Sequence, residues 1–431
     1  MKMANMDDYF DVVIVGTGAA GLYCALNLPA RYRILLLTKQ KADESDSFLA
    51  QGGICMQHGE ADYRSFFDDT MRAGHYENNP ATVDLMIRSS NSIIRDLVRR
   101  GVRFARDDHG ALRFTREGAH SRPRILFHED ITGHEITQTL LNEVLRCENI
   151  ELREHTTLLD FFADASACGG VIAAGPDGEP RAIGAGAVVA CGGIGGLYKN
   201  STNFPHITGD AIAMALRHGV ACEHLDYIQI HPTTLYSHRK GRRFLISESV
   251  RGEGALLLDK NGNRFTNELQ PRDVVSAAIR AQMEKDGTDH VWEDMRSIGE
   301  AAIREHFPNI LERCEEEGYD PIHEPIPVVP AQHYFMGGIT ADLSSRTALP
   351  RLYACGETCC NGVHGRNRLA SNSLLESLVF AQRAADDILY GEPPVFTGDK
   401  PDLAPYREQE PLFAAYRQEV LTAIERSKNH E

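Results

Sequence analysis

The sequence predicts an α/β fold in which a doubly wound, mostly parallel sheet is joined to an inserted α+β domain and a short C-terminal helical tail. Three observations favour it. The apolar run at residues 10–15 leads straight into a glycine-rich loop, as the first strand of such a sheet does. Two more apolar runs end in glycines far along the chain, at Gly192 and Gly356. Between these runs, residues 223–336 lack the nucleotide-binding pattern.

The glycine-rich loop has the spacing G-x-G-x-x-G, and its residues are Gly16, Thr17, Gly18, Ala19, Ala20 and Gly21. A helical pattern follows it, and a second apolar strand covers residues 33–37. In this context the first glycine makes a tight turn, the second admits a pyrophosphate and the third lets the helix pack closely. The N–H groups at the helix start bind phosphate. A Rossmann-like dinucleotide unit is favoured over a glycine-rich turn without a ligand.

The dinucleotide is expected to be FAD rather than NAD. An NAD-binding unit places an acidic residue after the second strand, and this chain has Thr38 and Lys39 there. Lys39 is instead expected near a phosphate or the adenosine ribose. The later runs at residues 187–193 and 352–357 fit a flavoprotein sheet that the chain leaves and re-enters. Taken singly, Gly192 and Gly356 would be ordinary turns at strand ends, but together with the N-terminal unit they favour a flavin. Glu357, after the later strand, is well placed to bind a ribitol or ribose hydroxyl.

Composition narrows the class of protein. The 431 residues carry a net charge of −16, which disfavours nucleic-acid and anionic membrane surfaces. No apolar run is long enough to span a membrane, and the polar, acidic residues 1–8 are unlike a signal peptide. The ten cysteines are scattered, and the one cluster, Cys355, Cys359 and Cys360, has no common zinc-site spacing. We therefore expect a reducing, cytoplasmic location and no bound metal.

Several motifs carry a more specific resemblance. They are Ser47-Phe48-Leu49-Ala50-Gln51-Gly52-Gly53, His231-Pro232-Thr233, Arg251-Gly252-Glu253-Gly254, Pro271-Arg272-Asp273 and the run Arg368-Leu369-Ala370-Ser371-Asn372-Ser373-Leu374-Leu375-Glu376. Over roughly residues 9–390 the chain resembles the fumarate reductase / succinate dehydrogenase flavoprotein family, and within that family the L-aspartate oxidases.

The resemblance implies which residues hold FAD. Besides the glycine loop they are Lys39, Asp46, the run from Ser47 to Gly53, Gly192, Gly193, Asp210, Glu357, Asn372, Ser373 and Leu374. Asp46 stands where the membrane-bound reductases have a histidine bonded to flavin, so FAD is expected to be non-covalent. Asp210 has an alternative role as a helix cap. The helix that begins near Ser371 is expected to direct backbone N–H groups of Ser373 and Leu374 at the flavin.

The substrate implied is a dicarboxylate, which needs paired cationic and donor groups inside this acidic protein. The resemblance implies that His231, Ser247, His333 and Arg368 bind its two carboxylates, with Arg272 near the reacting carbons. Arg272, His231, His333 and Arg368 form the expected catalytic set. Gln229 would face the same side of a strand as His231. Serine replaces the family's threonine at position 247 and precedes the matching Glu248. Each residue also has an ordinary alternative. His231 could be a structural or solvated histidine, Arg272 could form a surface ion pair or cap a helix, and Arg368 could be a solvent-exposed residue beside a helix start.

The loop Thr115-Arg116-Glu117-Gly118-Ala119-His120-Ser121 resembles the L-aspartate oxidase loop in which a glutamate recognises the substrate ammonium. A negative charge there favours aspartate over succinate. The alternative is that Glu117 is a solvated loop acid.

The function implied is FAD-dependent oxidation of L-aspartate to iminoaspartate, the first step of de novo NAD biosynthesis, with O2 or fumarate as acceptor. Arg272 either exchanges protons or only orients the substrate, because guanidinium is a poor base. Two rivals stay open: a soluble fumarate-reducing or succinate-oxidising flavoprotein, and a non-catalytic flavoprotein. Quinolinate synthase, the next enzyme that the resemblance implies, is a candidate partner.

Four segments are expected: 1–222 and 337–394 for the FAD-binding domain, 223–336 for a capping domain, and 395–431 for a helical tail that is shorter than in many relatives. Residues 321–330, with four prolines, are expected to form the return connection from the cap. Helical spacing marks residues 83–97, ended by Gly101, and residues 136–144. A third helix is expected from about Asp210 to Gly219.

Overall fold

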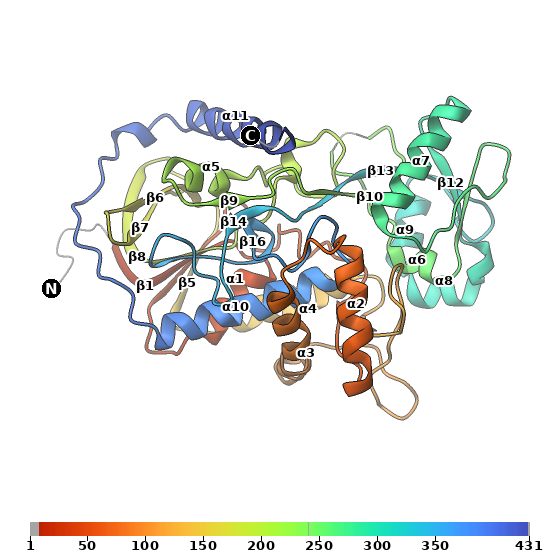
Figure 1. The fold of residues 1–431 in the computed structure, drawn as a ribbon, viewed down its shortest axis with the longest axis horizontal. Coiled ribbons are helices and arrows are strands. Elements are labelled where there is room, and N and C mark those ends of the chain that lie inside the picture. Colours follow the sequence, from red (N-terminus) through yellow and green to blue (C-terminus); the bar gives the residue numbers. More distant parts are fainter. Residues whose placement is uncertain (1–7, 240, 430–431) are drawn as a thin grey trace.

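The computed structural model describes residues 8–239 and 241–429 (Figure 1). Its largest sheet has seven strands in the order β5-β2-β1-β8-β7-β6, with β15 also paired to β8. The strands are β1 (Asp8–Val15), β2 (Ile34–Leu37), β5 (Ile150–Arg153), β6 (Thr157–Ala163), β7 (Cys168–Ala174), β8 (Pro180–Val189) and β15 (Leu352–Ala354). Strands β5, β2, β1, β8 and β15 are parallel, while β6 and β7 are antiparallel. The runs predicted from the sequence thus meet in one sheet.

Both faces of this sheet are covered, which explains why β2 and β15 are continuous apolar runs. Along β1, Val12 and Ile14 enter one core, and Val13 and Val15 enter the other. The helices that contribute to the first core are α1 (Ala19–Asn27), α2 (Tyr63–Ala73), α3 (Pro80–Arg100), α4 (Thr132–Val144) and α10 (Asn372–Tyr390). On the second face lie α5 (Asp210–Arg217) and α11 (Gln409–Lys428).

The three helices expected from periodicity are confirmed within a few residues. Helix α3 begins after Asn79, whose side chain accepts a hydrogen bond from the backbone N–H of Ala81 at 3.0 Å. It ends at Gly101, which has a φ of 102° and so adopts the left-handed conformation that terminates helices.

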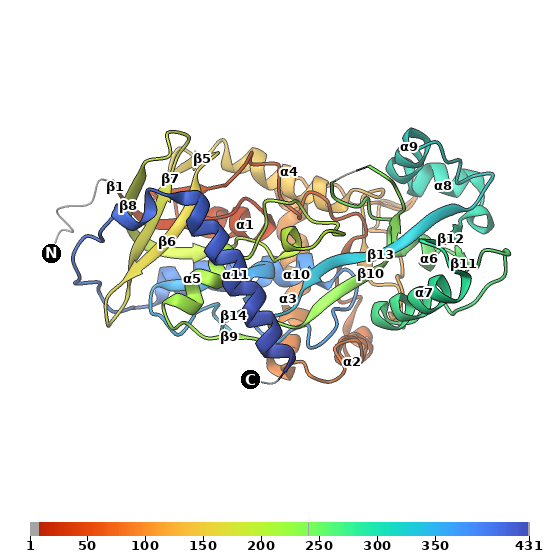
Figure 2. The ribbon, with the colours of Figure 1, turned by 90° about the horizontal axis from the view of Figure 1, so that it is seen from above.

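A second body lies at the end of the molecule away from the N-terminus (Figures 1 and 2). Its antiparallel sheet has the order β10-β13-β12-β11. The strands are β10 (Ile228–Leu235), β11 (Leu256–Leu258), β12 (Val291–Asp294) and β13 (Ile326–Phe335), and the helices are α6 (Glu248–Gly252), α7 (Arg272–Asp286), α8 (Glu300–His306) and α9 (Pro308–Glu316). These elements enclose a separate apolar core.

The remaining elements are short. Strands β9 (Cys222–Glu223), β14 (Gly338–Thr340) and β16 (Cys359–Cys360) form one small sheet, and β3 (Ile54–Cys55) pairs with β4 (Ile125–Leu126). Single 3₁₀ turns occupy Glu60–Asp62, Gly195–Leu197, Arg296–Ile298, Gly356–Thr358 and Ala404–Tyr406.

The proline-rich return connection is wrong in one respect, because its second half is strand β13, an interior strand of the sheet. Prolines usually exclude such a position, since they cannot donate to the ladder. The pairing of β10 with β13 explains how Pro330 is accommodated. His231 pairs with Ala331 and Thr234 with Val329, so two residues of β10 oppose Pro330 alone. At this bulge no ladder bond from residue 330 is required.

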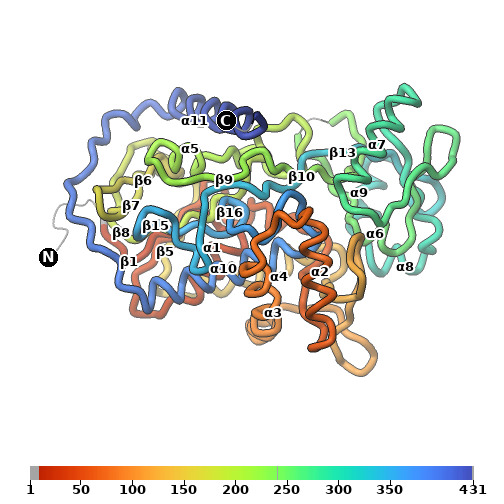
Figure 3. The backbone as a smooth tube through the Cα atoms, viewed as in Figure 1, coloured from red at the N-terminus to blue at the C-terminus, as the bar shows by residue number. Residues whose placement is uncertain are grey.

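The C-terminal tail returns along the outside of the body that contains the seven-stranded sheet, with α11 over α5 (Figure 3). Tyr416 is fully buried there and donates a hydrogen bond to the carbonyl of Leu159 at 2.7 Å, and Glu419 pairs with Arg217. All ten cysteines are free thiols. Within residues 8–239 and 241–429, no helix has the length and apolar character needed to cross a membrane. Residues 1–7, used in the expectation about a signal peptide, lie outside the described residues.

Glu293 of β12 should make the folding stability of the second body depend on pH. It is fully buried, neither carboxylate oxygen has a hydrogen-bond partner among the described residues, and burial raises the pKa of the carboxyl to about 8. The unfolded chain ionises this group near its ordinary pKa, so folding stability falls as pH rises from there to about 8. We predict that Glu293→Gln becomes progressively more stable than wild type over that window.

The measurement is the free energy of unfolding by urea at several pH values. Glu315→Gln, which removes an exposed carboxylate from α9, is the matched control and should follow wild type. Parallel pH profiles for Glu293→Gln and wild type would contradict the prediction.

Candidate functional site

A long cavity runs between the two bodies, from the glycine-rich loop to the segment before α10. It is lined by most of the residues that the sequence singled out. They are Gly16, Thr17, Gly18, Ala20, Lys39, Asp46, Ser47, Phe48, Leu49, Ala50, Gln51, Gly52, Gly53, Glu117, Gly192, Asp210, His231, Ser247, Glu248, Arg272, His333, Glu357, Arg368, Ser373 and Leu374. The five that do not line it are Ala19, Gly21, Gly193, Gln229 and Asn372.

The glycine-rich loop forms one end of the cavity. Gly16 has a φ of +111°, and a Cβ there would lie 2.1 Å from the carbonyl oxygen of Ala190. A Cβ on Gly21 would lie 1.9 Å from the carbonyl oxygen of Gly16. The first and third glycines therefore let the loop turn and the helix pack. The hydroxyl of Ser47 accepts from the N–H of Ala19 at 3.0 Å, which fixes the start of α1.

Lys39 lies beside this loop and pairs with Asp210 at 2.6 Å. It also donates to the carbonyl of His206 at 3.1 Å, and its ammonium lies 4.9 Å from the ring centre of Phe413 in α11. Asp210 is the first residue of α5 but makes no capping bond, because its carboxylate accepts from Lys39 and from the hydroxyl of Thr208. The helix-cap alternative for Asp210 is therefore wrong.

Two half-buried acids, Asp46 and Glu357, face the middle of the cavity. Asp46 accepts a hydrogen bond from the N–H of Phe204 at 2.9 Å, and Glu357 accepts one from the N–H of Phe335 at 2.9 Å. Burial raises the pKa of Asp46 to about 7. Burial, followed by the neighbouring Asp46, raises the pKa of Glu357 well above its ordinary value. Both groups can exchange hydrogen bonds with hydroxyls or ring nitrogens.

The cavity has the polarity that FAD requires. At the end of the cavity near the glycine loop, four buried polar atoms have no hydrogen-bond partner among the described residues: Thr17 Oγ1, Ser45 Oγ, Asp46 Oδ2 and Gln51 Oε1. Buried polar groups in native proteins are almost always paired. These atoms lie between the glycine loop and the 44–53 segment, so a polar dinucleotide bound there fits the residues present.

Arg368 places a buried guanidinium at the other end of the cavity. Its side chain is buried, donates through Nη1 to the hydroxyl of Ser373 at 2.9 Å, and lies 4.4 Å from the ring centre of Tyr334. No carboxylate of the described chain forms an ion pair with it, and its Nε has no partner there. Burial, and then Arg272, lower the pKa of Arg368 to about 10, so it stays charged at neutral pH.

His231 and His333 lie beside Arg368 with ring centres 5.0 Å apart. Nδ1 of His231 contacts the backbone of Thr233, and Nδ1 of His333 contacts the hydroxyl of Thr202 at 2.7 Å. Burial and the nearby Arg272 lower the pKa of both imidazoles well below the ordinary value, so both are neutral. Nε2 of His231, in the cavity wall, is unpaired among the described residues.

Arg272 is the first residue of α7 and is held by two partners. Its Nε donates to Glu248 at 2.5 Å, and its Nη1 donates to Oε1 of Gln229 at 2.8 Å. Gln229 in turn donates to the backbone carbonyl of Arg368 at 2.8 Å. Gln229 therefore does not line the cavity but links the two arginines. Ser247 caps α6 by accepting from the N–H of Ser249 at 3.2 Å.

Glu117 is buried, which rules out a solvated loop acid. It accepts hydrogen bonds from the hydroxyls of Ser249 at 2.8 Å and Ser371 at 2.5 Å. Burial, and then the neighbouring Glu248, raise its pKa. A Cβ on Gly52 would lie 2.3 Å from the Glu117 carboxylate, so this glycine makes room for it.

Sequence reasoning missed several lining residues. They include Ser45, Thr202, Asn203, Arg242, Phe244, Tyr334 and Ser371. Tyr334 and Ser371 adjoin motifs that were recognised, so an extended reading of those motifs could have found them. Arg242 and Thr202 come from loops without a distinctive local pattern.

Comparison with known proteins agrees with this geometry. The FAD binding domain family matches residues 11–374. An L-aspartate oxidase of Clostridium perfringens is 48% identical over 380 residues, which cover 88% of this chain and 86% of that protein. One from Nostoc sp. is 44% identical and covers 97% of this chain and 76% of its own length. The chain belongs to the L-aspartate oxidase family.

Among solved structures, a quinol-fumarate reductase with menaquinol molecules matches with a TM-score of 0.84 and 31% identity, over 95% of this chain and 75% of that one. A fumarate reductase from E. coli matches with a TM-score of 0.82 and 30% identity, over 95% and 74%. The expected resemblance and the α/β flavoprotein fold are confirmed, and the cofactor of this L-aspartate oxidase family member is FAD.

The close packing at Gly21 generates a prediction about cofactor binding. In Gly21→Ala the new Cβ overlaps the backbone of Gly16, so the loop must shift. Such overpacking costs about 1–3 kcal/mol, and we predict that FAD binds about 10- to 100-fold more weakly. Flavin absorbance per protein after purification, and FAD titration of the apoprotein, measure the effect. Gly175→Ala, whose Cβ would meet its nearest atom at 3.8 Å, is the control. Equal FAD affinity in the two variants would contradict the prediction.

Proposed function

We propose that this chain oxidises L-aspartate to iminoaspartate, with non-covalently bound FAD as the hydride acceptor. One observation carries the proposal: a buried, unneutralised guanidinium and a buried carboxylate, Arg368 and Glu117, line the same cavity. A dicarboxylate with an ammonium group is complementary to that pair of charges, and membership of the L-aspartate oxidase family supports the same substrate.

FAD held in this cavity would supply a hydride acceptor for the substrate α-carbon, whose C–N bond is thereby oxidised. We propose that the glycine loop, Lys39 and Glu357 hold its adenosine and ribitol portions. Ser373 and Leu374, in the first turn of α10, have backbone N–H groups without partners in the helix, which suit an anionic ring edge. Asp46 occupies the position of the flavin-linked histidine, and a carboxylate cannot form that bond.

Arg368 and the two imidazoles bind the substrate carboxylates in this proposal. A bidentate guanidinium–carboxylate pair fixes both distance and orientation. Since His231 and His333 are neutral, they donate single hydrogen bonds and add no positive charge. Ser247 offers a hydroxyl from the start of α6.

Arg272 orients the substrate rather than acting as the initial base. Its Nε and Nη1 are engaged by Glu248 and Gln229, which fixes the plane of the guanidinium and leaves Nη2 for the cavity. An arginine paired with a carboxylate keeps its proton. After the ammonium has bound beside Glu117, the positive charge of Arg272 favours loss of a proton from that ammonium to solvent, and the C–N bond gains double-bond character as hydride leaves the α-carbon.

Glu117 supplies selectivity. Its carboxylate attracts the ammonium of aspartate and disfavours succinate, which lacks a positive charge. The electron acceptor is O2, giving hydrogen peroxide, or fumarate, giving succinate. The product passes to quinolinate synthase in this proposal, and the free thiols fit a reducing, cytoplasmic location. We assign residues 1–222 and 337–394 to the FAD-binding domain, 223–336 to the cap and 395–431 to the tail.

The test is the flavin spectrum of the purified holoenzyme under anaerobic conditions. Addition of L-aspartate should bleach the absorbance of oxidised flavin near ~450 nm, and air should restore it with formation of hydrogen peroxide. Succinate should cause a small spectral perturbation without bleaching. Bleaching by succinate alone would favour the soluble fumarate reductase alternative, and no bleaching by either would contradict an enzyme of this class.

A further inference from the structure

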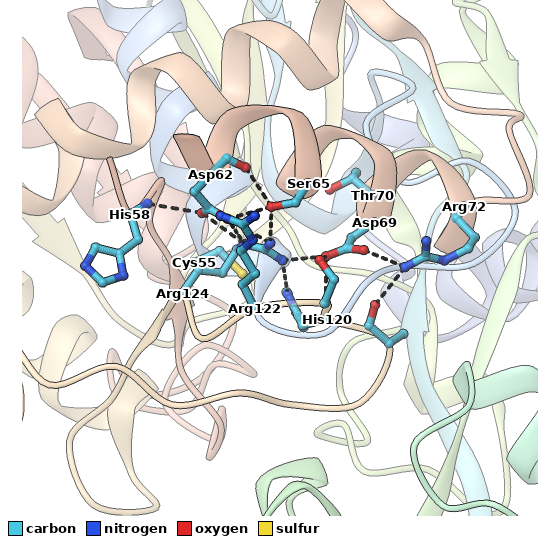
Figure 4. Close-up of polar contacts among 12 residues, drawn as sticks. Cys55, His58, Asp62, Ser65, Asp69, Thr70, Arg72, His120, Arg122 and Arg124 are labelled. Carbon is cyan, nitrogen blue, oxygen red and sulfur yellow. Dashed lines mark hydrogen bonds and ion pairs between the residues drawn. The ribbon is translucent and has the colours of Figure 1, made fainter. Parts of the chain in front are cut away.

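Figure 4 shows a buried ionic cluster around Arg124, with Asp62, Asp69 and His120, none of which lines the cavity. Arg124 is completely buried between two aspartates. Its Nη2 donates to Asp62 at 2.9 Å, and its Nη1 donates to Asp69 at 2.7 Å. Nη1 also lies 2.9 Å from Nδ1 of His120.

The contact with Arg124 decides the protonation of His120. A guanidinium has only donors, so Nδ1 of His120 must accept the hydrogen bond. The proton of a neutral imidazole then lies on Nε2. Burial, and then Arg124, lower the pKa of His120 to about 4, which is consistent with a neutral ring at physiological pH. His120 is thus fixed as a donor through Nε2.

Nε2 of His120 donates to the backbone carbonyl of Ala370 at 3.0 Å. The next residue, Ser371, has a φ of 61°, a left-handed conformation that is uncommon for serine. The N–H of Cys55 holds the carbonyl of Ser371 at 3.0 Å. The carbonyls of Ala370 and Ser371 are therefore both fixed, although the backbone at Ser371 is unfavourable.

The fixed segment has a direct effect on the candidate selectivity group. In this conformation the hydroxyl of Ser371 donates to Oε2 of Glu117 at 2.5 Å, while Ser249 donates to Oε1. The same segment carries Arg368 three residues earlier. His120 also belongs to the loop of Glu117, and the N–H and hydroxyl of Ser121 are held by Asp69 at 2.8 and 2.7 Å.

We propose that His120 is a positioning residue for substrate selectivity: through the carbonyl of Ala370 it holds the hydroxyl of Ser371 on Glu117, and thereby aims the Glu117 carboxylate at the substrate ammonium. The inference rests on the proposed function, because it assigns a determinant of the same site. It differs from a purely structural role, in which loss of His120 would lower stability and affect every ligand equally.

Two variants separate the two hydrogen bonds of the ring. His120→Asn retains an acceptor near the position of Nδ1 for Arg124 but loses the donor to Ala370. His120→Gln places an amide N–H near the position of Nε2 and retains that donor. His218→Asn is the matched control, because His218 is partly buried and contacts a carboxylate, Asp160, away from the cavity. Glu117→Gln sets the scale for loss of the ammonium contact.

For each holoenzyme the measurements are kcat and KM for L-aspartate, the dissociation constant of succinate from flavin difference spectra, flavin content and Tm. Weakening a hydrogen-bonded charge contact predicts that His120→Asn raises KM for L-aspartate about tenfold. Its succinate affinity should change by less than about twofold. His120→Gln and His218→Asn should both keep wild-type selectivity.

A second variant and a double mutant keep the proposal testable if His120→Asn folds poorly. Ser371→Ala removes the hydroxyl directly and should reproduce the selectivity loss. Combined with His120→Asn it should add little, because both changes act through Glu117. Parallel losses for aspartate and succinate in His120→Asn, equal defects in the Asn and Gln variants, or additive losses in the double variant would overturn the role of His120. Failure of wild type to oxidise L-aspartate would instead overturn the proposed function.

Discussion

The rest of the site depends on a buried positive charge, Arg368, that no carboxylate of the described chain neutralises. Burial of such a charge is costly, and the protein offsets only part of the cost through the ring of Tyr334 and the hydroxyl of Ser373. The second arginine differs, because Arg272 is paired with Glu248. The neighbouring imidazoles are neutral. A bound carboxylate therefore supplies the counter-charge that the fold withholds, which explains how an acidic protein attracts a dianion locally.

That charge is held in place by elements from both bodies. Strands β10 and β13 contribute His231 and His333, α7 contributes Arg272, and the segment before α10 contributes Arg368. Strand β13 pairs with both β10 and β12, so the strand that reaches the cavity is also an interior strand of the second sheet. Assembly of the site consequently requires the large sheet, the second sheet and the loop of Glu117 together.

The sequence predicted the parts of this account that depend on local chemistry. The glycine spacing at residues 16–21 predicted the loop, and the apolar runs predicted four strands that meet in one sheet. Recognisable motifs supplied about half of the residues that line the cavity. Features that depend on tertiary register were not predictable: the strand at residues 326–335, the link of Gln229 between two arginines, and the bond from His120 to Ala370 all join segments far apart in the chain. The ion pair of Lys39 with Asp210 is of the same kind.

The most direct test of the central claim is to remove the charge while keeping the volume, in Arg368→Met. The dissociation constant of a dicarboxylate such as succinate should rise about 10- to 100-fold, as expected for loss of a charged hydrogen-bonded contact. Because the guanidinium is buried without a counter-ion, the ligand-free holoenzyme should be as stable as wild type or more stable. Unchanged dicarboxylate affinity, or a large loss of stability without ligand, would contradict the account.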